Sequence, residues 1–373
     1  MKIVAVDSVI VKLPFEHGGA PTGFGGRSWG TIDILLVEVR SDGGMSGWGE
    51  AFGFNVSPAT KAVLDLMVAP LLIGEDPDDI DGLCAKIDRA LHLFGRNGPV
   101  AYAISGINIA LWDLKGKWAG LPLWRLLGGQ EKAKPIEAYA SLLRYGTPED
   151  VATNATRAVA GGYRAIKLHE VDLPCIEAAR TAIGTDIKLM VDVNCAWSFE
   201  TARNVAEAVR PLGLEWLEEP IWPPEDFASL ARLRAQTGVS IAAGENVTWH
   251  TVFRAMLAER AVDIVQPSVI KCGGVSEFSA ILAVAAEAGV RVAPHSPYFG
   301  PGFLATLHLI AASGRGMVFE RLYVDLPHNL YGAAIHPVDG WLQAPDGPGL
   351  GLDPDQDVIA RFRESASAAQ EAA

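Results

Sequence analysis

From about Pro135 onward, short apolar segments alternate with amphipathic segments, and the pattern repeats about every 25 residues. The apolar segments have the length of buried strands, and the segments between them show the spacing of amphipathic helices. We expect eight strands: Ile136–Leu142, Ala165–His169, Lys188–Val193, Leu214–Glu218, Ser240–Ala243, Asp263–Pro267, Arg291–His295 and Met317–Glu320. Eight strands alternating with helices favour an α/β fold of the TIM (β/α)₈ barrel type over an open doubly wound sheet.

The first 130 residues are organised differently and look α+β. An alternating strand at Met1–Leu13 is followed by a hairpin around Asp42-Gly43-Gly44, and helical segments follow at about 58–70, 77–93 and 99–119. Residues 17–30 form a glycine-rich loop without periodicity. This loop follows a strand but opens no helix, which excludes the dinucleotide-binding turn of a Rossmann fold.

Three carboxylates in the alternating region, Asp192, Glu218 and Glu245, each follow an apolar segment and lie one strand-plus-helix unit apart. Parallel strands carry such residues to the same end of a barrel, the end where active sites of TIM barrels lie. Converging carboxylates repel one another unless a cation lies between them, and oxygen ligands suit a hard divalent ion. The spacing therefore predicts a metal site.

The other expected strands bring further polar residues to the same end of the barrel. They are Lys167 and His169 from the second strand, Asn194 from the third, Ser268 and Lys271 from the sixth, His295 from the seventh and Glu320 from the eighth. Acids, histidines and lysines around one metal indicate a proton-transfer site. His169 would face solvent instead if the strand register were shifted by one residue, and Ser268 could be a small packing residue. We expect Lys271 to pair with a barrel acid.

The composition limits the classes of partner. A formal net charge of −13 and a pI near 5.1 argue against nucleic acid or a membrane as partner, and leave a small-molecule acid drawn in by local positive charge. The four cysteines form no CxxC pair, and no segment reads as a signal peptide or a membrane span. We expect a cytoplasmic protein with reduced thiols.

Six sequence segments together resemble the enolase superfamily, within its mandelate racemase-like group. They are ALWDLKGKWAGLPLWRLLGG, VDVN, EEP, GEN, IKCGG and APHS, in that order along nearly the whole chain. The resemblance implies an α+β capping domain at residues 1–130, a modified, (β/α)₇β-like barrel at 131–325, and a C-terminal segment at 326–373 that packs back on the cap. It also implies a homo-oligomer, a dimer or an octamer.

The resemblance further implies a chemical role for each of these residues. Mg²⁺ would be bound by Asp192, Glu218 and Glu245, and a proton α to a substrate carboxylate would be removed. Lys167 matches the lysine that neutralises the substrate carboxylate, and His295 matches the histidine on the opposite face of the substrate. Glu320 matches an acid that donates a hydrogen bond to the substrate carboxylate and must then be protonated.

Two positions depart from the pattern of the family. His169 replaces the second lysine of a Lys-x-Lys motif, so the base from this strand would be an imidazole. Ser268 replaces the aspartate that pairs with the histidine in racemases, and a serine cannot stabilise an imidazolium as a carboxylate does. One good base and one proton-donating histidine favour β-elimination of water, and hence an acid-sugar dehydratase.

Other functions stay open at this point. A racemase, an epimerase or a cycloisomerase would use the same first step, and a non-catalytic binding protein could keep the fold. We expect substrate selection to come from the cap, where His17, Phe24, Arg27 and Trp29 lie in the glycine-rich loop. Glu50, in a strand of the hairpin, could reach the site or merely close the hairpin. An exposed glycine-rich lid without a binding role would have the same sequence pattern.

Overall fold

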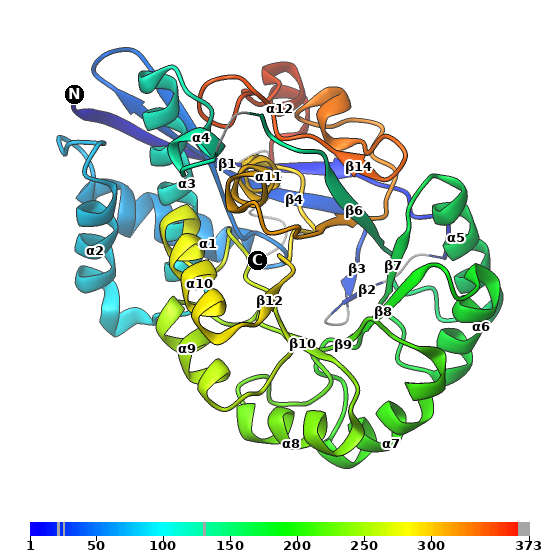
Figure 1. Ribbon diagram of the computed structural model, residues 1–373. Helices are drawn as coiled ribbons and strands as arrows, with labels where there is room; N and C mark the ends of the chain where they lie inside the picture. Colours follow the sequence, from blue (N-terminus) through cyan, green and yellow to red (C-terminus); the bar gives the residue numbers. More distant parts are fainter. Residues whose placement is uncertain (21–22, 25–26, 130–131, 365–373) are drawn as a thin grey trace.

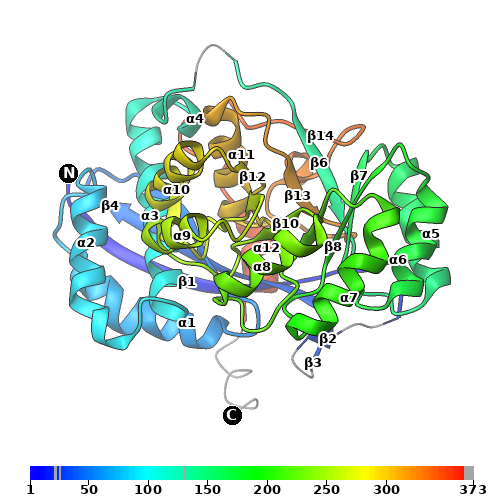
Figure 2. The ribbon, with the colours of Figure 1, turned by 60° about the horizontal axis from the view of Figure 1, so that its bottom comes forward.

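The computed structural model of the chain describes residues 1–20, 23–24, 27–129 and 132–364. A barrel with helices around its outside occupies most of the molecule, and the N-terminal sheet with helices α1 to α3 packs against one side of it (Figures 1 and 2).

The barrel strands are hydrogen-bonded side by side in the order β12-β11-β10-β9-β8-β7-β6-β13, with every neighbouring pair parallel. They are β6 (Ile136–Ser141), β7 (Ala165–Leu168), β8 (Lys188–Asp192), β9 (Trp216–Glu218), β10 (Ile241–Ala243), β11 (Ile264–Val265), β12 (Arg291–Val292) and β13 (Phe319–Leu322). Most of these strands are shorter than expected, because the ends of the apolar segments leave the sheet to form the loops at its carboxyl edge.

Seven α-helices connect these eight strands within residues 132–364, which confirms the modified barrel. They are α5 (Pro148–Ala160), α6 (Leu173–Ile183), α7 (Phe199–Val209), α8 (Phe227–Thr237), α9 (His250–Ala258), α10 (Gly274–Ala288) and α11 (Pro301–Ser313). Several begin at a capping side chain; Thr147, Ser198 and Asp226 each accept a hydrogen bond from a backbone N–H of the first turn. A short helical turn, η4 (Arg210–Leu212), follows α7.

The alternation of side chains along the strands sets up the site. One buried layer inside the barrel is mostly apolar and consists of Tyr139, Ala165, Met190, Trp216, Ala242, Ile264 and Ala293. Successive side chains of a strand point to opposite faces, so the residue two positions further on returns to the interior. On the second, third and fourth barrel strands these residues are Lys167, Asp192 and Glu218, each at most 1% exposed. The apolar layer therefore forms the floor beneath a buried charged layer.

The cap contains an antiparallel sheet of β1 (Ile3–Pro14), β4 (Thr31–Ser41) and β5 (Ser46–Ala51). The helical elements beside it are α1 (Ser57–Val63), η1 (Leu64–Val68), η2 (Ala69–Leu71), α2 (Ile80–Leu91), η3 (His92–Phe94), α3 (Pro99–Ala119) and α4 (Leu123–Leu126). Strand β5 lies so close to α3 that a side chain at Gly47 or Gly49 would collide with the helix backbone. The predicted hairpin is confirmed.

The glycine-rich loop differs from the prediction. Two short strands, β2 (Gly23–Phe24) and β3 (Arg27–Ser28), pair within it in an antiparallel manner. A two-residue strand is too short to produce an alternating pattern in the sequence. Strand β2 also begins with glycine, which is uncommon in strands.

The C-terminal segment returns to the cap. It contains η5 (Gly332–Ile335), β14 (Trp341–Leu342), which pairs with β6, and α12 (Gln356–Phe362). Just beyond α12, Glu364 donates its backbone N–H to the carbonyl of Ile10, and its carboxylate lies 2.9 Å from Lys12 Nζ. The domain limits at 130 and 325 stay predictions, and residues 130 and 131 lie outside the described part of the chain.

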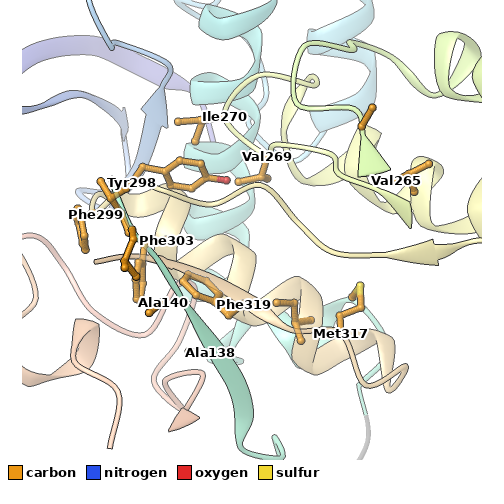
Figure 3. Close-up of a cluster of buried hydrophobic side chains, with 14 of the residues drawn as sticks. Ala138, Ala140, Val265, Val269, Ile270, Tyr298, Phe299, Phe303, Met317 and Phe319 are labelled. Atoms are coloured by element: carbon orange, nitrogen blue, oxygen red, sulfur yellow. The ribbon is translucent and has the colours of Figure 1, made fainter. Parts of the chain in front are cut away.

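Helix α11 is buried between the barrel and the cap. Figure 3 shows its Phe303 beside Phe319 of β13, with ring centroids 4.6 Å apart. Tyr298 and Phe299 precede the same helix in the loop after β12. Aromatic pairs of this kind add to the stability gained from burial alone and fix the loop that follows His295.

No helix in the described residues is long and apolar enough to cross a lipid bilayer. The four cysteines are free.

Candidate active site

Three carboxylates meet at the carboxyl edge of the barrel. Asp192 ends β8, Glu218 ends β9, and Glu245 follows β10 by two residues. Each offers one oxygen atom, and these three atoms lie within 4.8 Å of one another. Asp192 and Glu218 are at most 1% exposed. Three acids at this separation, two of them fully buried, cannot all ionise without a compensating cation.

Lys167 of β7 lies below this group and joins it to a fourth acid. Its Nζ is 3.2 Å from Asp192 Oδ2, 2.8 Å from Glu218 Oε1 and 2.7 Å from Glu320 Oε1. The side chain is fully buried. Burial opposes its charge, but Glu218 and Glu320 outweigh burial and hold the pKa of Lys167 well above its usual value. Lys167 is therefore a permanent positive charge.

The ionisation of the three acids is uneven. Burial and the neighbouring Asp192 raise the pKa of Glu218 well above its usual value. Burial opposes ionisation of Asp192, but Lys167 and His169 keep its pKa below the usual value. Burial likewise opposes ionisation of Glu245, yet His295 and Lys271 lower its pKa to about 2. The pKa directions thus favour a proton on Glu218 and negative charges on Asp192 and Glu245, and a bound divalent cation would favour ionisation of all three.

These three residues fit Mg²⁺. Oxygen donors from carboxylates are the ligands that this ion takes, and three such donors would leave several positions of an octahedral ion to water and substrate oxygen. The backbone just after the ligands is unusual, because Asn194, Cys195 and Glu219 all have positive φ, at 47°, 57° and 43°. Non-glycine residues adopt this conformation at some cost, and such positions cluster at functional sites.

A second set of side chains supports the ligands. Asn246 donates its Nδ2 to both oxygens of Glu219, at 3.0 and 2.9 Å, and accepts from Lys271 Nζ at 3.1 Å. Lys271 is also 3.6 Å from Glu245. Burial, and then the nearby Glu245, raises the pKa of Glu219 to about 8. The expected pairing of Lys271 with a barrel acid is found in the structure.

His169 lies beside the ligands at the end of β7. Its Nδ1 is 2.6 Å from the carbonyl oxygen of Leu142. A carbonyl only accepts, so Nδ1 carries the hydrogen, and Nε2 is the basic nitrogen of the neutral ring. Nε2 lies 3.3 Å from Asp192 Oδ2, toward the metal ligands. The side chain is 17% exposed and lines the pocket, so the register that would turn it away is excluded.

His295 follows β12 and approaches the ligands from another side of the barrel. Its Nε2 is 3.0 Å from Glu245 Oε2. Its Nδ1 is buried and has no hydrogen-bond partner in the part of the chain that the structure describes. Ser268 is fully buried and does not line the pocket. No carboxylate of the described residues takes the place of the aspartate that racemases have here.

Glu320 of β13 differs from the prediction in its protonation state. It accepts hydrogen bonds from Ser141 Oγ at 2.8 Å and from the backbone N–H of Ser296 at 3.0 Å, and it pairs with Lys167. Burial opposes its ionisation, but Lys167 outweighs burial, and the pKa of Glu320 is lowered. Three donors around its carboxylate favour an ionised Glu320, in contrast to the protonated acid that we expected.

A pocket of about 700 Å³ opens above the ligands, between barrel and cap. The barrel side is lined by His169, Asn194, Glu245, Lys271 and His295, all of them expected from the sequence. The cap contributes Trp29 and Glu50, also expected. Glu50 is 2% exposed and accepts the backbone N–H of Gly302 at 2.8 Å, and burial raises its pKa to about 8.

The other cap residues fit the prediction less well. His17 does not line the pocket; it is 6% exposed, and its ring stacks on Tyr145 with centroids 5.5 Å apart. His17 as a contact residue for the substrate is therefore corrected to a packing residue. The side chains of Phe24 and Arg27 lie outside what the structure describes.

The sequence prediction missed several lining residues. Phe52, Tyr102, Arg144, Trp222 and Tyr298 all border the pocket. Arg144 had a usable signal, since it follows the first barrel strand, whose end was left out of the expected set. Tyr102 and Trp222 had none, because an aromatic residue in a helix or loop is more often part of a core.

Comparisons with known proteins agree with this geometry. Residues 9–128 match the family described as mandelate racemase / muconate lactonizing enzyme, N-terminal domain, and residues 150–358 match the one described as enolase C-terminal domain-like. The chain is 34% identical to the D-galactarolactone cycloisomerase of Agrobacterium fabrum, over 97% of this chain and 99% of the relative. It is 32% identical to the arabinonate dehydratase of Saccharolobus solfataricus, over 89% and 91%.

A solved structure links the fold to a metal. A racemase from Streptomyces coelicolor A3(2), crystallised with bound magnesium, is 27% identical to this chain and superposes with a TM-score of 0.83. The match covers 97% of this chain and all of the neighbour.

Proposed function

This chain belongs to the enolase superfamily, in the mandelate racemase / muconate lactonizing enzyme family, and we propose that it is a Mg²⁺-dependent acid-sugar dehydratase. The observation that carries the proposal is the convergence of Asp192, Glu218 and Glu245 within 4.8 Å, with a histidine on either side. Relatives named as dehydratases and cycloisomerases support an enzyme over a non-catalytic binding protein.

The three carboxylates would hold Mg²⁺, which supplies the Lewis acid that makes the proton α to a carboxylate removable. Lys167 holds the ligands Asp192 and Glu218 in place, together with Glu320, through its three ion pairs. Glu320, ionised and held by Ser141 and Ser296, balances that lysine rather than touching the substrate.

His169 is the base in this proposal. The carbonyl of Leu142 fixes the Nδ1 hydrogen, so Nε2, which lies 3.3 Å from Asp192 Oδ2, is the nitrogen that would take the α-proton when the metal holds that carboxylate. The electron pair of the broken C–H bond then forms the enediolate, and its return expels the oxygen on the β-carbon. His295 gives its proton to that leaving oxygen, so water departs and an enol remains, which tautomerises to a 2-keto-3-deoxy acid.

Cycloisomerisation is the second candidate, favoured by the name of the Agrobacterium fabrum relative. The first step is the same, but the β-oxygen that leaves belongs to the sugar ring, so the ring opens and no water is lost. A carboxylate leaving from a lactone is already a weak base and needs little help from an acid such as His295. Racemisation is less well supported, because His295 has no carboxylate partner at Nδ1 among the described residues and pairs with Glu245 only through Nε2.

The test is a panel of acid sugars and their lactones, incubated with the protein and Mg²⁺ in heavy water and followed by NMR. Deuterium at the α-carbon with loss of water marks the dehydratase. Ring opening without loss of water marks the cycloisomerase, and exchange with only stereochemical scrambling marks a racemase. Absence of exchange in every acid tested would contradict the proposed function.

We also propose that the protein works in the cytoplasm on a small carboxylic acid and assembles as a dimer or an octamer. The free cysteines suit a reducing compartment. Light scattering on the purified protein measures the assembly directly.

A further inference from the structure

Arg144 is fixed at the edge of the pocket by the loop that follows β6. Its Nε donates to the carbonyl oxygen of His169 at 2.7 Å, which ties the guanidinium to the strand that carries the base. The adjacent backbone is anchored as well, since the N–H of Tyr145 donates to the buried carboxylate of Glu170 at 2.6 Å. The hydroxyl of Tyr145 donates to the carbonyl of His17 at 2.8 Å. The position of Arg144 is therefore set before any ligand arrives.

The terminal nitrogens of Arg144 are free to bind a ligand. Neither makes a hydrogen bond or an ion pair with any residue in the described part of the chain, and the side chain is exposed on the pocket wall. The other lining cation, Lys271, is 5% exposed and is held by Glu245 and Asn246. Of the arginine and lysine side chains in the described lining, Arg144 is thus the one without a carboxylate partner.

The remaining charges of the lining do not compete for this arginine. On the cap side, Asp33 accepts from Thr31 Oγ1 at 2.8 Å and lies 3.9 Å from Lys12. Glu50 is turned toward the backbone of Gly302. In a protein with a net charge of −13, a second anionic group of a substrate needs a local cation, and Arg144 supplies one.

We propose that Arg144 binds a second carboxylate, at the far end of the substrate, and so selects an acid sugar with a carboxylate at both ends over one with a single carboxylate. The inference rests on the proposed function, in which the first carboxylate lies at the metal. The planar guanidinium matches a carboxylate in a two-point contact, and one nitrogen already bound to the backbone keeps the other two directed. Arg144 is then a substrate-binding residue that determines specificity.

A purely structural role would look different in experiment. If Arg144 only held the carbonyl of His169, its loss would disturb the base and slow every substrate by the same factor. If it binds the far carboxylate, its loss slows diacids alone. Kinetics with a diacid and the matching monoacid therefore separate the two roles, as long as the Arg144 variant folds.

The first experiment measures kcat and KM for α-proton exchange with galactarate against galactonate, and glucarate against gluconate, in Mg²⁺. We expect the native protein to favour the diacid of a pair at least about tenfold. Arg144→Gln should lower kcat/KM for the diacid about 10- to 100-fold, mostly through KM, and leave the monoacid within about threefold. Arg144→Lys, which keeps the charge and loses the fork, should fall between them.

The control is Arg254→Gln, which removes an exposed arginine that pairs with Glu287 on the outer helices, away from the pocket lining. Arg254→Gln should leave kcat/KM unchanged for both the diacid and the monoacid. Equal loss for diacid and monoacid in Arg144→Gln, or a native preference for the monoacid, overturns the inference while leaving the proposed reaction intact.

A binding measurement keeps the inference testable without turnover. Calorimetry with Mg²⁺ compares glutarate with butyrate, two acids that differ in the second carboxylate and carry no leaving group. If glutarate binds more tightly than butyrate and this preference is lost in Arg144→Gln, the inference is supported. This holds even if no acid sugar reacts, in which case only the proposed reaction is contradicted. Equal affinity for the two acids in the native protein contradicts the inference.

Discussion

The two histidines of the site reach the metal ligands from strands on different sides of the barrel, and their surroundings are unlike (Figure 1). On the β7 side, His169 has Nδ1 held by the carbonyl of Leu142, and its neighbour Lys167 has three carboxylate partners. On the β12 side, His295 Nδ1 has no partner among the described residues, and Ser268 stands where a carboxylate would hold it.

This difference indicates a division of labour. A histidine with a fixed tautomer presents the same basic nitrogen to every substrate, which suits proton removal. His295 pairs with Glu245 through Nε2 but has no partner at Nδ1 to fix its tautomer, which suits it better to giving a proton to a leaving group than to serving as the base. Racemisation needs a group on each face of the substrate that can both accept and return the proton, and the unpartnered Nδ1 of His295 argues against that role for His295.

The largest effect is expected on the β7 side, at Lys167. Lys167→Met leaves Asp192, Glu218 and Glu320 without their buried cation, and removing one partner of a buried ion pair costs about 3–5 kcal/mol. We expect lost activity and a free energy of unfolding lowered by about that amount, measured by urea denaturation without Mg²⁺. Lys188→Met, at an exposed residue of β8, is the control. A loss below about 1 kcal/mol would show that the β7 side does not depend on this network.

The next largest effect is on the base itself. His169→Asn should reduce formation of the keto acid by about 10²- to 10⁴-fold, because the α-proton has no acceptor, while Mg²⁺ binding measured by titration changes little. His250→Asn is the matched control, since that histidine pairs with Glu277 away from the ligands. Activity near that of the native protein in His169→Asn would remove the residue from the mechanism.

A substitution at Ser268, on the β12 side, should give His295 Nδ1 a partner, as His169 Nδ1 has on the β7 side. Ser268 comes one residue after Pro267, whose carbonyl accepts the backbone N–H of His295 at 3.1 Å. We expect the new carboxylate of Ser268→Asp to reach His295 Nδ1, and therefore a several-fold slower elimination and new scrambling at the α-carbon. Chiral chromatography of the recovered substrate detects it. Ser268→Asn has the same shape without the charge, and equal scrambling in both variants would rule out the electrostatic explanation.

The last effect is a change in how stability depends on pH, with no loss of activity expected from it, and it concerns the buried cap residue Glu50. Burial raises the pKa of Glu50 to about 8, whereas the unfolded chain ionises this group near its usual value of 4.5. The folded state therefore holds the proton between these two pH values, and Glu50 makes stability fall as pH rises, by up to about 1.4 kcal/mol per pH unit. Glu50→Gln should flatten that slope in denaturation curves between pH 5 and about 8. An unchanged slope would show that Glu50 is ionised in the folded protein.

The fold could be predicted because its period is long and regular. Strand and helix segments recur through the barrel, and side chains two positions apart share a face, so the residues Lys167, Asp192 and Glu218 follow from the strand ends alone. The short pair β2 and β3 could not be predicted, since two-residue strands carry no period.

The site could be predicted less completely than the fold. The protonation state of Glu320 depends on Lys167 and Ser296, which the chain brings to it only by folding. His17 lies in a glycine-rich loop and has a side chain suited to substrate contact, yet it packs on Tyr145. The two residues are far apart in the sequence, so no local pattern could predict that they stack. Arg144 could not be identified from the sequence as a binding residue, because only the folded structure shows that its terminal nitrogens have no partner among the described residues.

The most direct test of the division of labour is α-proton exchange in the two histidine variants, measured by NMR in heavy water with Mg²⁺ and a substrate of the native protein. In His295→Asn, we expect deuterium to enter the α-carbon of recovered substrate while product formation is strongly reduced, because His169 still removes the proton. In His169→Asn, we expect neither exchange nor product. Exchange that persists without His169 and is lost without His295 would contradict the account.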